Sequence, residues 1–109
     1  MQLKIKTTDF LDTVRKLEKM APLGRGKKAY LEGSISISCA QNYAIFTCSF
    51  TAKQVCPAEG FWDAHVFFPF EIARSFLKVP PKNEYMEITC INKKIKIEGL
   101  TTSANVVYL

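Results

Sequence analysis

The stretch Ala64–Val79 reads Ala-His-Val-Phe-Phe-Pro-Phe-Glu-Ile-Ala-Arg-Ser-Phe-Leu-Lys-Val and decides the fold. It predicts a short strand that runs directly into an amphipathic helix. Pro69 closes the strand, and the helix is expected from about Phe70 to Lys78. Apolar side chains recur at helical spacing on the inner face, with charged ones opposite them. Pro80 and Pro81 then prevent the helix from continuing.

The N-terminal stretch Leu3–Met20 has the same plan. An offset of 62 residues (71 − 9) sets Asp9 on Glu71 and Val14 on Phe76. A half-buried strand is predicted over 2–6, followed by N-capping oxygens at 7–9 and one apolar helical stripe. Pro22 and Gly24 are expected to end this helix. The chain therefore contains one strand–helix–strands unit used twice.

Alternating patterns after each helix predict the remaining strands. They are expected over 34–40, 43–50, 51–56, 85–91, 94–98 and 102–109. Setting Cys39 on Cys90 gives a smaller offset of 51 (90 − 39), because the first half has a longer basic segment after its helix. We expect a single domain, residues 1–109, with pseudo-repeats at about 1–58 and 63–109. The fold class is α+β, with two helices packed on antiparallel sheet.

Composition narrows the functional classes. No apolar run approaches the roughly 20 residues that span a bilayer, and the N-terminus lacks a signal core, so a cytoplasmic protein without membrane contact is expected. The four cysteines form no Cys-x-x-Cys pair, which favours buried thiols over a metal site. Neither a catalytic triad nor a nucleotide loop is present, so we expect no enzyme activity and no cofactor. The net charge of +5 favours an anionic partner.

Two further segments allow alternative interpretations. Gly24–Lys28, with Arg25, Lys27 and Lys28, is predicted to be a flexible basic loop, either merely solvated or touching a nucleic-acid backbone. The connector at 58–63 contains Phe61 and Trp62. These aromatic side chains either fold back on the core or form an exposed patch that binds a partner.

The doubled unit resembles one domain of the sliding DNA clamps, the bacterial polymerase III β clamps and proliferating cell nuclear antigen. The resemblance covers nearly the whole chain. It is strongest over Phe-Pro-Phe-Glu-Ile-Ala-Arg-Ser-Phe-Leu-Lys-Val-Pro at 68–80 and Met-Glu-Ile-Thr-Cys-Ile-Asn-Lys-Lys-Ile-Lys-Ile-Glu at 86–98. These are fold patterns and not catalytic signatures. Family subunits carry two or three such domains, whereas this chain has one.

The resemblance implies a non-catalytic, DNA-associated scaffold or accessory in replication or repair, with copies joined edge to edge into a ring. Basic side chains on the helices would then face duplex DNA and contact phosphates without reading sequence. The alternative for these side chains is the ordinary solvated face of an amphipathic helix. The expected DNA-binding set is Arg15, Lys16, Lys19, Arg25, Lys27, Lys28, Arg74 and Lys78.

A second hypothesis uses the same scaffold differently. The chain would be a small protein-binding module, such as an immunity protein, an inhibitor or a decoy, with its basic face on an acidic protein surface. Changing Lys16 and Lys78 to Glu discriminates between the two, because only the DNA-associated protein would lose salt-sensitive duplex binding.

Overall fold

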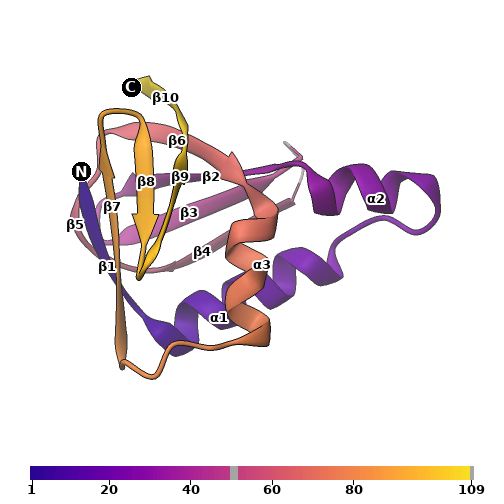
Figure 1. Ribbon diagram of the computed structural model, residues 1–109, viewed down its shortest axis with the longest axis horizontal. Helices are drawn as coiled ribbons and strands as arrows, with labels where there is room; N and C mark the ends of the chain where they lie inside the picture. Colours follow the sequence, from indigo (N-terminus) through magenta and orange to yellow (C-terminus); the bar gives the residue numbers. More distant parts are fainter. Residues whose placement is uncertain (50–51, 109) are drawn as a thin grey trace.

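The computed structural model describes residues 1–49 and 52–108 (Figure 1). Phe50, Thr51 and Leu109, at which three expected strands begin or end, lie outside this part. The elements in chain order are β1 (Gln2–Lys6), α1 (Thr7–Lys19), α2 (Arg25–Glu32), β2 (Ser34–Ala40), β3 (Tyr43–Cys48), β4 (Ala52–Pro57), β5 (Glu59–Phe61), β6 (Ala64–Pro69), α3 (Phe70–Lys78), β7 (Tyr85–Ile91), β8 (Lys94–Ile97), β9 (Leu100–Ser103) and β10 (Asn105–Tyr108).

The two sheets show that the unit is duplicated. One sheet has the order β5-β1-β7-β8-β9 and the other β10-β6-β2-β3-β4. Replacing each strand of the first sheet by its counterpart in the other repeat reproduces the second sheet. Every pairing is antiparallel. Each sheet therefore takes strands from both repeats, so neither repeat can complete a sheet alone. The α+β clamp-like fold class is confirmed.

The offset of 51 is confirmed by the strands, whereas the offset of 62 is wrong by one residue. β2 and β7 begin 51 positions apart (85 − 34) and end 51 apart (91 − 40). The two helices begin 63 apart (70 − 7). Ile5 and Phe68, the last fully buried residues of β1 and β6, are also 63 apart. Strand alternation thus sets where each helix begins, and Asp9 is not the counterpart of Glu71.

The first helix begins earlier than its polar residues predicted. Lys6 is the N-cap residue, and none of the described side chains caps the helix. Thr7 is buried in the first turn, where its backbone N–H donates to Glu84 O at 2.8 Å and its Oγ1–H donates to Asn83 O at 2.6 Å. The loop before β7 therefore supplies the acceptors that a local cap would have supplied.

Phe10 stands at the centre of the core. Its ring is fully buried and meets Phe46 of β3 and Phe76 of α3 edge to face, both at 5.9 Å between centroids. One residue of α1 thus joins a sheet to the second helix. Figure 1 shows α1 and α3 together beside the two sheets, as the duplicated architecture requires. None of the described helices is both long and apolar enough to cross a membrane.

Three expectations about local structure were wrong. The basic segment is not a loop but the start of a third helix, α2. Tyr30, near the C-terminal end of this helix, is buried and stabilises it. The connector at 58–63 contains β5, which pairs with β1. The single C-terminal strand is two strands, β9 and β10, which belong to different sheets.

Candidate nucleic-acid interface

The basic face of α1 is largely balanced by acids on the same helix. Arg15, Lys16 and Lys19 are all exposed, but the helix also carries three carboxylates and has no net charge. Lys16 Nζ lies 3.0 Å from Asp12 Oδ2, and both side chains are more than half exposed. Such a pair contributes about 0–1 kcal/mol to stability. It nevertheless lowers the positive potential that Lys16 presents to an anion.

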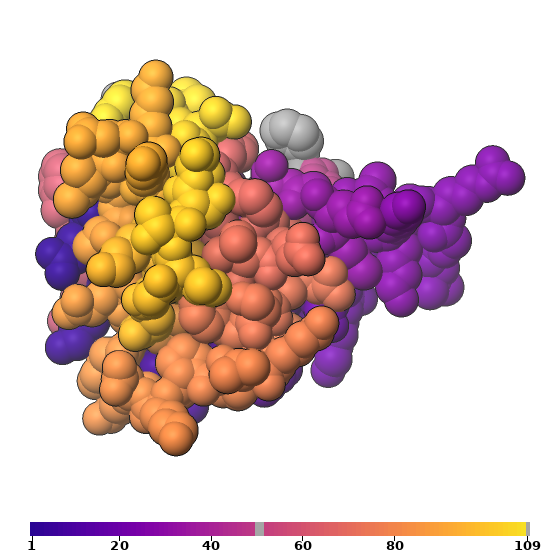
Figure 2. All heavy atoms as spheres, viewed as in Figure 1, coloured from indigo at the N-terminus to yellow at the C-terminus, as the bar shows by residue number. Residues whose placement is uncertain are grey.

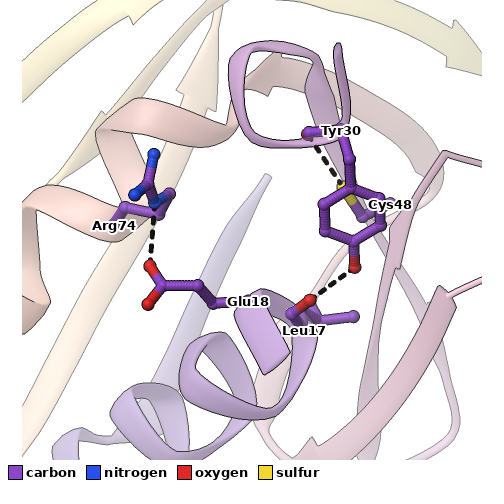
Figure 3. A network of polar contacts seen from close by, with 5 residues as sticks. All are labelled: Leu17, Glu18, Tyr30, Cys48 and Arg74. Atoms are coloured by element: carbon purple, nitrogen blue, oxygen red, sulfur yellow. Dashed lines mark hydrogen bonds and ion pairs between the residues drawn. The ribbon is translucent and has the colours of Figure 1, made fainter. Parts of the chain in front are cut away.

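Arg74 of α3 joins the two duplicated helices. Its Nε–H donates to Glu18 Oε2 at 2.8 Å, across 56 positions of sequence (Figure 3). Sequence reasoning placed Arg74 facing outward, and its side chain is 32% exposed. The structure adds Glu18 as its partner, which helical spacing within either repeat could not reveal. Lys78, one turn further along α3, is exposed.

α2 is the most basic of the three helices. Arg25, Lys27 and Lys28 outnumber its one acid, Glu32, and all three cations are exposed. Within the described part of the chain, none of these three cations forms an ion pair. The second repeat has no helix at the corresponding place, so α2 is an addition to the duplicated plan. Figure 2 shows it projecting from the side of the molecule.

Tyr30 anchors this helix to the rest of the domain. Its hydroxyl donates to Leu17 O of α1 at 2.5 Å, and its ring meets Phe70 of α3 edge to face at 6.0 Å (Figure 3). The Cys48 thiol lies 3.9 Å from Tyr30 O. Burial, and secondly the nearby Cys48, raises the pKa of the Tyr30 hydroxyl well above its usual value. It therefore stays a neutral donor.

The anchor could have been recognised in the sequence. An apolar pair, Tyr30 and Leu31, follows the basic residues, and Gly33 comes just after them as a helix stop. The glycines Gly24 and Gly26 instead favour a loop. The tertiary contacts of the buried Tyr30 ring outweigh this local preference and stabilise the helix.

The two aromatic residues of the connector at 58–63 behave differently: one packs on the core and the other is exposed. Trp62 is buried, and its Nε1–H donates to Ile37 O at 3.0 Å. The prediction that Trp62 contacts a partner is therefore wrong for this conformation, because the indole is enclosed and its only donor is satisfied. Phe61 is 67% exposed on β5. Any partner contact from this pair thus falls to Phe61.

One surface hollow lies away from the three helices. It has a volume of about 490 Å³ and lies over β1, β7 and β8. It is lined by Lys4 and Lys96 but also by Glu84, Glu87 and Glu98, so its acids outnumber its bases. Lys4 Nζ lies 4.6 Å from the centre of the Tyr85 ring. A hollow of mixed charge offers no preference for an anion, and it contains none of the predicted DNA-binding residues.

Three of the predicted cations line one smaller groove. The groove lies between α2 and the α1–α3 pair, has a volume of about 330 Å³, and is lined by Lys19, Lys27, Arg74, Glu18 and three apolar side chains. The other five predicted cations do not line it: Arg15, Lys16, Arg25, Lys28 and Lys78. The structure therefore divides the predicted set into a groove and a more dispersed helix surface.

No protein-family model matches the sequence, and no curated protein matches it significantly. Among solved structures, the chain is similar to the crystal structure of the beta subunit from DNA polymerase of Streptococcus pyogenes. The TM-score is 0.73 at 11% sequence identity, over 96% of this chain and 30% of that one. At this identity the likeness concerns the fold. The chain thus has the fold of a clamp-like domain and spans about a third of the clamp subunit it resembles.

Proposed function

We propose that this chain is a non-catalytic, clamp-like protein of the cytoplasm that associates with duplex DNA through the solvent faces of its helices. The observation that carries the proposal is the packing of α1 against α3, with the basic α2 docked beside them. Three helices from different parts of the chain thereby lie next to one another. Contacts from lysine and arginine to phosphates suit sequence-independent association that weakens with salt.

Association into a ring is part of this proposal. The clamp subunit from Streptococcus pyogenes is about three times the length covered here. Copies of this domain would join through the edges of their sheets, which among the described strands are β4, β5, β9 and β10. β4 contains Lys53 and Pro57, and β5 is three residues long, features that discourage pairing. β9 and β10 lack charge and proline, so we expect the contacts to use at least one of them.

The test is salt-dependent binding to a fluorescently labelled duplex of arbitrary sequence. A Kd on the order of 10⁻⁴–10⁻⁶ M is expected at physiological salt, and log K should fall linearly with log salt. Because Lys16 shares its charge with Asp12, the sharper variant is Arg15→Glu with Lys78→Glu. This variant should bind at least about tenfold more weakly.

The matched control is Lys93→Glu with Lys94→Glu, at the end of the turn between β7 and β8 and at the first residue of β8. Figure 1 places that turn at the opposite end of the molecule from α1. Both variants lower the net charge from +5 to +1, since each reversal removes two charges. Equal losses of binding would show that only total charge matters and that the helix surface is wrong. Light scattering on the same samples reports whether copies assemble.

The alternative is a small protein-binding module on the same scaffold. The observation that favours it is Phe61, an aromatic ring 67% exposed on a three-residue edge strand. A wild-type protein that binds no duplex but co-purifies with one protein in a defined ratio would support this alternative. Loss of that partner on Phe61→Ser, with Val107→Ser as the exposed apolar control on β10, would locate the contact.

A further inference from the structure

We propose that the groove between α2 and the α1–α3 pair is a phosphate-binding site that grips the backbone of duplex DNA. This rests on the proposed function and names the part of the surface that holds the phosphate. The groove is formed by residues from three helices: Lys19 from α1, Lys27 from α2 and Arg74 from α3. Only one carboxylate, that of Glu18, also lines it.

Glu18 orients Arg74 and leaves it able to bind an anion. The carboxylate accepts the Nε–H of Arg74 at 2.8 Å, while the terminal nitrogens of the guanidinium carry four more donors. Figure 3 shows the guanidinium extending beyond Glu18. An arginine held in one rotamer by a carboxylate loses less entropy when it binds a second oxyanion. The groove then holds two lysines and this guanidinium against one acid.

The arm α2 has little structural reason to exist apart from such contacts. All residues from Pro22 to Ala29 are exposed, and Tyr30 is the one buried side chain of the helix. The second repeat connects its helix to the next strand with six residues, 79–84, and no arm. The fold therefore closes without an arm. In the first repeat the arm instead brings Lys27 to the side of Lys19 and Arg74.

A phosphodiester fits this groove better than an acidic peptide does. The three donors come from three helices and line one small hollow, which suits a single compact anion. The groove opens beside the α1–α3 pair, which is the surface proposed to carry the duplex. A backbone phosphate at this point would be held from both sides, by the arm and by the helix pair.

The experiment compares two double neutralisations on equal terms. Lys19→Gln with Lys27→Gln removes the two groove lysines, and Arg25→Gln with Lys28→Gln removes two exposed cations of the arm that do not line the groove. Each lowers the net charge from +5 to +3. The groove variant should lose on the order of tenfold in duplex affinity and about 2 units of salt slope, about one for each contact. The control should lose clearly less.

Two additional probes identify the anion. Inorganic phosphate should shift the backbone amide resonances at Lys19 and Lys27 in the wild type and leave them in place in the groove variant. Polyglutamate should compete poorly with the duplex. Stronger binding of polyglutamate than of duplex would make the groove a protein site and overturn the proposal.

The outcomes separate this inference from the proposed function. If the groove variant and the control bind duplex equally well while Arg15→Glu with Lys78→Glu still loses affinity, the groove is not the phosphate-binding site, but the proposed helix surface is still supported. If the wild type binds no duplex, both fail. Circular dichroism and thermal unfolding of each variant confirm that the comparison is made between folded proteins.

Discussion

Tyr30→Phe tests whether one hydroxyl holds the arm on the domain. The substitution keeps the ring, and with it the edge-to-face contact with Phe70 at 6.0 Å, but removes the bond to Leu17 O at 2.5 Å. A neutral buried hydrogen bond contributes about 0.5–1.5 kcal/mol. Leu17 O also accepts the Met20 N–H at 3.2 Å, so the carbonyl is not left unsatisfied. We therefore expect a cost of about 1 kcal/mol and not the larger penalty of an orphaned acceptor.

Hydrogen exchange and thermal unfolding distinguish where that cost appears. A loss of about 1 kcal/mol corresponds to roughly fivefold faster amide exchange in α2 and at its C-cap residue Gly33, whose N–H donates to Tyr30 O. If the arm unfolds with the domain, the Tm falls instead by about 4–8 °C. The control is Tyr43→Phe, because the Tyr43 side chain is half exposed. Unchanged exchange in α2 together with an unchanged Tm would refute the assignment of Tyr30 as the anchor.

Three further predictions concern the fold. Gly60→Ala should lower the free energy of unfolding by at least about 2 kcal/mol, because Gly60 has φ +131° and a Cβ there would lie 2.1 Å from Gln2 O. The control Gly99→Ala, whose Cβ would have no neighbouring atom within 4 Å, should change it by no more than about 0.5 kcal/mol. Urea titrations measure both. Phe10→Ala should cost about 3–5 kcal/mol, and a loss below about 1 kcal/mol would contradict its central place. Burial, with nearby Cys56, raises the pKa of Cys39 from 9.0 to about 11. Because the unfolded thiol ionises first, stability should be intact below pH 9 and decline up to about pH 11, and Cys39→Ala should flatten this decline.

Local pattern was sufficient for the elements that repeat. The strand-to-helix passage at Pro69 and the bounds of α3 follow from apolar spacing and proline alone, and the structure has that helix at Phe70–Lys78. The offset of 51 between β2 and β7 was likewise visible, because side-chain alternation shows which face each residue occupies. These signals act within a few residues of one another.

The candidate site could be predicted only in part, because its contacts join residues that are far apart in the sequence. The cations themselves are visible in the chain, and helical spacing shows which of them face solvent. Their partners are not visible, because Glu18 and Arg74 are 56 positions apart and meet only when α1 packs on α3. The exchange of strands between the repeats could not be predicted either. The alternation of side chains along a strand indicates which face is buried, but it does not indicate which strand lies next to it.

The sequence by itself determined that a strand–helix unit occurs twice and that the protein carries excess positive charge. It also determined where the two helices of this unit begin to within three residues. Only the tertiary structure decided that each sheet is shared between the repeats, that Trp62 turns inward while Phe61 stays out, and that the basic segment is a helix. The physical reason is the range of the forces concerned. Periodicity and turn chemistry act along the chain, whereas one buried ring, Tyr30, ordered α2 through contacts with α1 and α3 that no local pattern encodes.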